Sequence, residues 1–156
     1  MYHIYLDFDG TVVEHAYPHM GGFNPGAAGV IKQLQEKGHK IFLNTYRADL
    51  STPKEGTDKT PLEKAQEYLQ YILPRYLPLQ KDQDEFEYKF ETLPTKVGPF
   101  PFVLSDELQV YTIAEKPTIF LDDHSTGMPI RPTSDGNSYM VDWVETERIL
   151  KEAGIL

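Results

Sequence analysis

Two aspartates stand at the end of a short apolar segment near the N-terminus. Residues 2–8 are mostly apolar, Asp7 and Asp9 close the segment, and Gly10 follows. The pattern predicts a buried strand, after which Gly10 lets the chain turn sharply. Buried carboxylates are costly unless they are paired or bind a cation, and ligands of open α/β sheets bind at the carboxyl ends of strands. We therefore expect a ligand site here; the alternative is an edge strand with two solvated acids in its turn.

Two later segments end in the same way. Residues 40–45 form a short apolar run that closes on Thr45, and residues 118–123 form another that closes on Asp122 and Asp123. Lys116 lies just before the second run. If these are parallel strands, they bring four carboxylates and a hydroxyl to one edge of a sheet, with Lys116 nearby.

The clustered carboxylates predict a bound cation. Two like charges about 4 Å apart repel by about 4 kcal/mol at an effective dielectric constant near 20. Four carboxylates therefore need a cation to stay ionised near neutral pH. Oxygen ligands in a chain without cysteine favour Mg²⁺, which prefers octahedral oxygen coordination.

These segments resemble the motifs of the haloacid dehalogenase-like (HAD) hydrolases, a superfamily made up mostly of Mg²⁺-dependent phosphatases. The sequence Asp-Phe-Asp-Gly-Thr-Val at residues 7–12 is similar to the first motif. Thr45 matches the second motif, Lys116 the third, and Asp122 with Asp123 the fourth. The resemblance spans residues 2–124, carries little weight between 75 and 113, and extends to the small members without a cap domain.

The resemblance implies a role for each matched residue. Asp7 would be the nucleophile that forms an aspartyl-phosphate and also a metal ligand, and Asp9 the general acid and base, with its carbonyl on the metal. Asp123 would bind Mg²⁺ directly, and Asp122 would act through water. The expected phosphate-binding residues are Gly10, Thr45 and Lys116, of which Lys116 also neutralises charge during the reaction. An aspartate at position 9 is typical of phosphatases in this superfamily and not of dehalogenases.

Two residues near the motifs, Arg47 and His15, are open to more than one interpretation, and two others have a single expected role. Arg47 could clamp a second anionic group of the substrate or be a solvated surface residue. His15 falls in the loop after the first motif, where it could contact substrate or pack. Asn44 is expected to make local hydrogen bonds, and Asp49 to be a surface acid.

The elements between these motifs predict one α/β domain over residues 1–156, with a Rossmann-like, mostly parallel sheet flanked by helices and no large cap. Asn24-Pro25 has the form of a helix start and Gly38 that of a stop. Thr60 opens a second helix with capping-box spacing, and a C-terminal helix is expected from Asp142 to Ala153.

Residues 79–115 have the least regular pattern. Residues 86–91 alternate like a strand, and 102–104 and 109–113 could be short strands. The region is interpreted either as a small insert facing the substrate or as an irregular connection, and the second is favoured. Residues 125–138 are expected to form a loop, followed by a strand at 139–141.

The composition of the chain limits the kinds of molecule that it is expected to bind. The formal net charge of −9 disfavours proteins that grip nucleic-acid backbones. The sequence contains no cysteine, no apolar run long enough for a membrane span and no signal-peptide pattern, which is compatible with a cytoplasmic protein that does not bind membranes. A small-molecule phosphomonoester is the favoured substrate; the alternatives are a polynucleotide 3′-phosphate end and a catalytically silent phospho-ligand module. The oligomeric state stays open.

Overall fold

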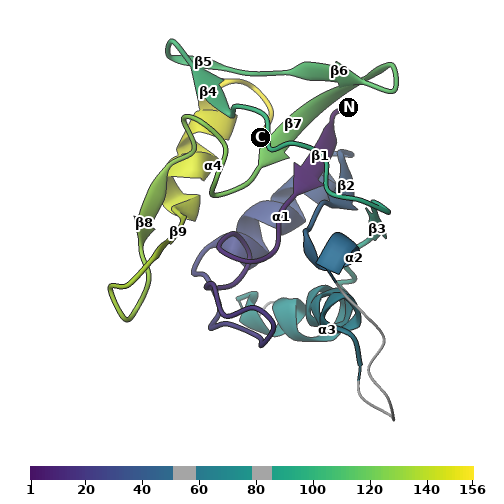
Figure 1. Ribbon diagram of the computed structural model, residues 1–156. Coiled ribbons are helices and arrows are strands. Elements are labelled where there is room, and N and C mark those ends of the chain that lie inside the picture. The colour runs from purple at the N-terminus through teal and green to yellow at the C-terminus, as the bar shows by residue number, and fades with distance from the viewer. Residues whose placement is uncertain (51–58, 79–85) are drawn as a thin grey trace.

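The computed structural model describes residues 1–50, 59–78 and 86–156, and a five-stranded sheet forms its centre (Figure 1). The strand order is β3–β2–β1–β7–β6, and only β6 runs antiparallel to its neighbour. This confirms the predicted mixed α/β architecture with a mostly parallel sheet. The strands are β1 (His3–Leu6), β2 (Lys40–Leu43), β3 (Phe90–Thr92), β6 (Tyr111–Ile113) and β7 (Lys116–Leu121).

The three central strands alternate between two faces of the sheet. Ile4 and Leu6 of β1 belong to the main hydrophobic core, whereas Tyr5 faces the opposite way. On that second face Tyr5 pairs across the strands with Phe42 and Phe120. Aromatic side chains of the segment between β3 and β7 cover it, because Phe100 and Tyr111 both pack on Phe120. The strands are thus buried on both sides, as expected for a parallel sheet.

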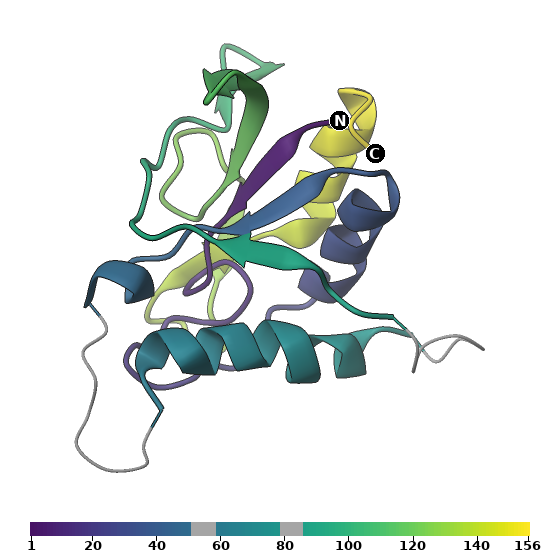
Figure 2. The same ribbon diagram turned by 90° about the vertical axis from the view of Figure 1, so that its right-hand side faces the viewer.

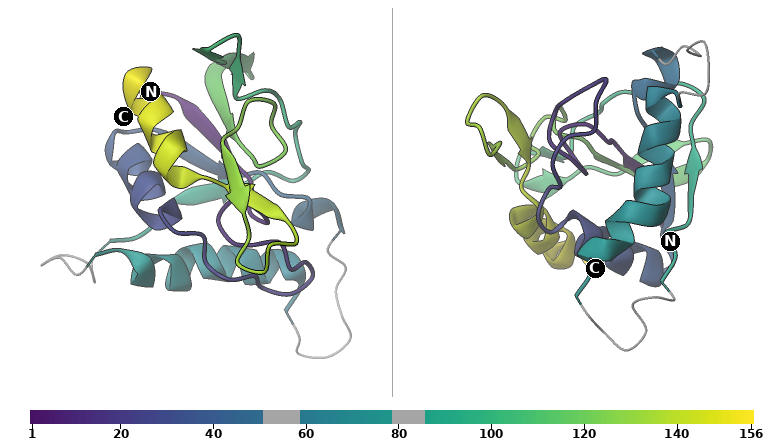
Figure 3. Two further views of the ribbon diagram at one scale, coloured as in Figure 1. Left: turned by 90° about the vertical axis from the view of Figure 1, so that its left-hand side faces the viewer. Right: turned by 90° about the horizontal axis from the view of Figure 1, so that it is seen from below.

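Helices α1, α3 and α4 pack on the main-core face, whereas the short α2 contacts α3. Figures 2 and 3 show α1 and α4 side by side, with α3 crossing beneath them. Each buries one apolar stripe: for α1 this is Ala27, Val30, Ile31 and Leu34. The helices are α1 (Ala27–Glu36), the short α2 (Arg47–Leu50), α3 (Pro61–Glu67), which continues as a π-helical turn η1 (Tyr68–Ile72) and a 3₁₀ turn η2 (Leu73–Tyr76), and α4 (Trp143–Glu152).

Two of the three predicted helix starts are confirmed. The Thr60 hydroxyl caps α3 by accepting from the amide of Glu63, and the Asp142 carboxylate caps α4. The prediction for Asn24 is wrong, since the residue before α1 is Gly26. Asn24 is instead buried and donates to the carbonyls of Thr11 and Val141, so its side chain ties the loop after β1 to a distant strand.

Two small hairpins lie outside the main sheet in the described chain. One joins β4 (Val103–Leu104) to β5 (Glu107–Leu108), and the other joins β8 (Ile130–Pro132) to β9 (Tyr139–Val141). The strand at 139–141 is confirmed, but the loop predicted over 125–138 contains β8. Likewise the strand predicted at 86–91 begins only at Phe90. Residues 79–85 lie outside the described part.

The register of the sheet places the candidate site. Leu6, Leu43 and Leu121 end their strands opposite one another. The next residues continue the ladder: the amide of Asp7 donates to the Leu121 carbonyl at 2.9 Å, and that of Asn44 to the Leu6 carbonyl at 2.8 Å. The carboxyl ends of three strands therefore meet side by side. Between β1 and β2 the chain holds one helix, α1, in keeping with the expectation of no large cap there.

The described helices are all too short or too polar to cross a bilayer.

Candidate active site

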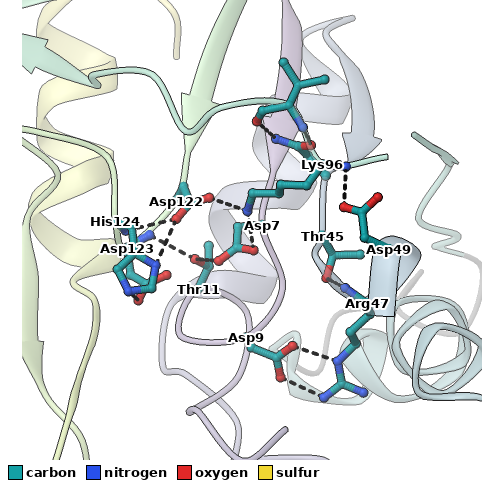
Figure 4. Close-up of polar contacts among 12 residues, drawn as sticks. Asp7, Asp9, Thr11, Thr45, Arg47, Asp49, Lys96, Asp122, Asp123 and His124 are labelled. Atoms are coloured by element: carbon teal, nitrogen blue, oxygen red, sulfur yellow. Dashed lines mark hydrogen bonds and ion pairs between the residues drawn. The ribbon is translucent and has the colours of Figure 1, made fainter. Parts of the chain in front are cut away.

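Three aspartates from β1 and β7 form a compact acidic cluster (Figure 4). Asp7, Asp122 and Asp123 can each contribute one carboxylate oxygen to a group whose members lie within 4.8 Å of one another. Asp7 and Asp122 are buried, and the side chain of Asp123 is only 5% exposed. The Thr11 hydroxyl donates to Asp7 Oδ2 at 3.0 Å and accepts from the amide of Asp123 at 3.3 Å. The strand ends thus bring together three of the four carboxylates that the sequence predicts to converge, whereas Asp9 lies outside this cluster and pairs with Arg47.

A lysine that the sequence did not point to completes this cluster. Lys96 Nζ lies 2.9 Å from Asp7 Oδ1 and 2.5 Å from Asp122 Oδ2, and its side chain is 3% exposed. Burial lowers the pKa of Lys96, but the two carboxylates outweigh this and raise it above its usual range. Burial raises the pKa of Asp7 well above its usual range and Asp122 adds to the shift, while Lys96 acts in the opposite direction.

Lys116 does not take part in this site, and the prediction that it does is wrong. It is exposed and begins β7, whereas the acidic pair follows the last residue of that strand. At about 3.3 Å per residue, the strand separates Lys116 from Asp122 by about 20 Å. Lys96 occupies the expected position instead, because it follows β3, the fourth parallel strand, whose carboxyl end lies at the same edge. The sequence signal that could have indicated this residue is a lysine, Lys96, a few residues after the strand-like pattern at 86–91.

Two side chains beside Thr45 hold the segment that carries Lys96. The amide group of Asn44 pairs with the backbone of Val97, donating to its carbonyl and accepting from its N–H, both at 2.8 Å. The carboxylate of Asp49 accepts from the Thr95 hydroxyl at 2.5 Å and from the Lys96 N–H at 2.9 Å. These bonds lower the pKa of Asp49. Asn44 and Asp49 therefore hold the segment that carries Lys96 in place, whereas the sequence predicts only a local hydrogen-bonding residue at 44 and a surface acid at 49.

Thr45 lines the pocket over the cluster, and Gly10 packs against His15 and Asp123. Thr45 is buried directly after β2, and its hydroxyl accepts from the N–H of Arg47 at 3.1 Å. Gly10 adopts a φ of +79°, and a Cβ at this position would come within 2.1 Å of His15 Nε2 and 2.6 Å of Asp123 Oδ2. Only glycine leaves room here for His15 to reach the acidic cluster.

Arg47 is buried and bound to Asp9, so neither interpretation offered by the sequence describes it. Its Nε and Nη2 donate to the two oxygens of Asp9, both at 2.7 Å. The remaining donors reach the carbonyls of Pro61 at 2.9 Å and His19 at 2.8 Å. Arg47 is 1% exposed. The arginine thus joins Asp9, the loop after β1 and the start of α3 in one buried network.

Two histidines lie next to Asp123. His15 Nε2 is 2.7 Å from Asp123 Oδ2, a bond that raises the pKa of His15. His124 Nε2 lies 3.7 Å from the same oxygen, but its side chain is 69% exposed. The other oxygen of Asp123, Oδ1, is buried and has no hydrogen-bond partner among the described residues.

The acidic cluster fits a divalent cation. Its donors are carboxylate oxygens, the ligands that Mg²⁺ prefers, and Asp123 Oδ1 is a buried acceptor without a partner. His15, Asp123 and His124 form a second group with ligand atoms within 4.8 Å, of mixed nitrogen and oxygen character. Among these residues the all-oxygen set suits Mg²⁺ better.

A pocket of about 160 Å³ opens over the cluster. Asp7 and Lys96 line it together with Asp9 and Arg47, so both ion pairs border the same space. The other lining residues are His15, Tyr17, Thr45, Tyr46, Leu50 and His124. Of the predicted site residues, Gly10, Lys116, Asp122 and Asp123 do not line this pocket. Asp122 contacts the lining residue Lys96, and Asp123 contacts the lining residue His15.

Comparison with known proteins adds one distant similarity. The chain matches no protein-family model and no curated protein. Among solved structures it is similar to a conserved protein coded by a locus from Bacteroides thetaiotaomicron, with 22% sequence identity and a TM-score of 0.49 over 97% of this chain and 90% of that one.

Proposed function

We propose that the chain is a Mg²⁺-dependent phosphomonoester hydrolase of the HAD type, which works through an aspartyl-phosphate on Asp7. The observation that carries this proposal is the acidic cluster at the strand ends, with Lys96 Nζ held between Asp7 and Asp122. A carboxylate nucleophile, an all-oxygen metal set and a buried cation side by side are components that phosphoryl transfer needs.

Asp7 acts as the nucleophile. One of its oxygens attacks phosphorus, and the new bond forms as the bond between phosphorus and the alcohol oxygen breaks; the alcohol leaves with a proton that Asp9 donates. Water then gives a proton to Asp9 and attacks the phosphorus of the aspartyl-phosphate, which releases phosphate and restores the Asp7 carboxylate. The Thr11 hydroxyl, 3.0 Å from Asp7 Oδ2, fixes the side chain so that it is oriented before the substrate arrives.

The phosphoryl oxygens are held by groups that surround Asp7. Lys96 supplies a fixed positive charge, which stabilises the growing negative charge in the transition state. Thr45 lines the same pocket and offers its hydroxyl. Because Asn44 and Asp49 brace residues 95–97, Lys96 needs little reorganisation when the reaction proceeds.

Asp9 serves as the acid and base. Its carboxylate lines the pocket, but in this structure both oxygens accept N–H groups of Arg47. To give a proton to the leaving alcohol, Asp9 must turn from Arg47 toward the pocket. Arg47 keeps its bonds to the carbonyls of Pro61 and His19 meanwhile, so it stays in place to receive Asp9 again.

Asp7, Asp122 and Asp123 are the residues that would hold Mg²⁺. When bound, the ion supplies positive charge that neutralises the carboxylates and polarises the phosphoryl group. His15 has to release Asp123 Oδ2 for that oxygen to serve as a ligand, since the two atoms are 2.7 Å apart.

Phosphate release from a panel of phosphomonoesters tests the proposal. The panel holds an aryl phosphate, sugar phosphates, nucleotides and a 3′-phosphorylated oligonucleotide, each assayed with Mg²⁺ and with EDTA. We expect Mg²⁺-dependent release that Asp7→Asn abolishes and that Asp106→Asn, an exposed control, leaves unchanged. Phosphate release by Asp7→Asn at the wild-type rate would refute the assignment of Asp7 as the nucleophile. If no compound of the panel released phosphate, the chain would be a phospho-ligand binding module instead.

A further inference from the structure

Exposed apolar side chains border the mouth of the pocket. Tyr17 is 42% exposed, Tyr46 52% and Leu50 57%, and all three line the same space as Asp7. They come from two segments: Tyr17 from the loop after β1, and the other two from the region of α2. Exposed aromatic rings around a polar pocket are a feature of surfaces that bind a ligand.

Each tyrosine is fixed over one of the two buried cations of the site. Arg47 Cζ lies 5.4 Å from the centre of the Tyr17 ring, and Lys96 Nζ lies 5.0 Å from that of Tyr46. The arginine packs against Phe8 as well, with a distance of 5.1 Å to that ring. One ring therefore stands beside the Asp9 pair and the other beside the Asp7 pair, each held by a cation–π contact.

The pocket is too small for a whole drug-sized ligand. Its volume of about 160 Å³ is below the roughly 300–1,000 Å³ of common small-molecule sites. A phosphoryl group at Asp7 and the first atoms of the alcohol would fill it. The rest of the leaving group must then lie at the mouth, against Tyr17 and Tyr46.

The cationic side chains of the pocket wall are already paired, which favours an uncharged leaving group. Arg47 and Lys96 are both paired with carboxylates, and His15 is paired with Asp123. Among the described lining residues these cations are thus already engaged by the protein. Besides these cations, a second anionic group on the substrate finds only the exposed His124 on the described wall, whereas a flat ring finds two aromatic surfaces.

We infer that this site takes phosphomonoesters whose leaving group carries a flat aromatic ring, packed against Tyr17 and Tyr46. The inference rests on the proposed function, because it names the substrate class of that site. A simple phenol and a nucleobase share this chemistry, and the experiment separates them.

Binding of two phosphonates, which cannot be hydrolysed, tests the inference without turnover. Calorimetry with Mg²⁺ compares phenylphosphonate with methylphosphonate. We expect the phenyl compound to bind about 2- to 12-fold more tightly for each ring that it contacts. Tyr17→Ala and Tyr46→Ala should each reduce this preference, while Tyr139→Ala, an exposed tyrosine of β9 outside the pocket wall, should change neither the preference nor the affinity for methylphosphonate.

Equal affinities for the two phosphonates would overturn the inference, as would no binding of either or a preference that both tyrosine variants retain. Phosphate release then separates this inference from the proposed function. If phenylphosphonate is preferred and no ester is hydrolysed, the proposed function fails and the ring site stands. If phenyl phosphate and glycerol phosphate are hydrolysed with equal kcat/KM, the aromatic-ring inference fails and the proposed function stands. Adenosine monophosphate in place of phenyl phosphate shows whether the ring is a nucleobase.

Discussion

Replacing Lys96 by methionine removes one ammonium group from between two buried carboxylates and keeps a side chain of similar length. Asp7 and Asp122 have side chains 8% and 1% exposed, so both would be left as unpaired acids away from water. Removing one partner of a buried ion pair costs about 3–5 kcal/mol. Since Lys96 serves two carboxylates, we expect a loss near the upper end, a large part of the roughly 5–15 kcal/mol that stabilises a typical domain.

Urea unfolding measures this loss directly. The single tryptophan, Trp143, is 1% exposed and reports on the core by its fluorescence. With EDTA near neutral pH, Lys96→Met should lose about 3–5 kcal/mol, and added Mg²⁺ should restore part of it by binding the freed carboxylates. The matched control is Lys116→Met, an exposed position expected to change stability by about 0.5 kcal/mol or less. Equal effects of the two variants would refute our placement of the site lysine.

Three further outcomes follow from the same contacts. Asp7→Asn should stabilise the metal-free protein: the pKa of Asp7 is raised by folding, so wild-type stability falls as the pH rises from the ordinary value of 3.8 through the raised pKa, and the variant escapes this decline. Arg47→Lys should lower the free energy of unfolding by about 1.5–3 kcal/mol for each charge-assisted bond to Asp9 that is lost, because lysine cannot form the fork. Asn44→Ala should lower kcat/KM for phosphate release, because it frees the segment that carries Lys96.

Exposed residues provide the controls for these variants. Arg148→Lys on α4 should cost little, so an Arg47→Lys variant of equal stability would contradict the buried fork. Asn137→Ala should leave kcat/KM unchanged, and an Asn44→Ala variant that behaves the same way would show that the brace on residues 95–97 is not needed. A gain in stability of Asp7→Asn that persists at a pH below 3.8 would show that the raised pKa is not its cause.

The sequence predicts the parts of the site that depend on local pattern. Apolar runs that end in Asp7, Thr45 and Asp122 are short-range signals, and parallel strands carry their ends to one edge whatever lies between them. The capping residues Thr60 and Asp142 are equally local. These features could be placed because each depends on neighbours within a few residues.

What the sequence does not predict depends on contacts between distant segments. Lys96 reaches the acidic cluster because β3 pairs with β2, and this pairing brings together residues far apart in the chain. Lys116 lies nearer to Asp122 in sequence, yet the length of β7 carries it away. Arg47 could not be assigned either, because its partners Asp9 and His19 belong to the loop after β1, whose shape is set by tertiary packing.

The central claim is that Asp7 becomes phosphorylated, and chemical trapping tests it most directly. The protein is mixed with Mg²⁺ and an aryl phosphate, quenched during turnover with borohydride, and digested for peptide mass spectrometry. Borohydride reduces an acyl phosphate to an alcohol, so we predict homoserine at position 7, absent when substrate or Mg²⁺ is omitted. Steady phosphate release with an unmodified Asp7, or homoserine at another aspartate, would contradict the account.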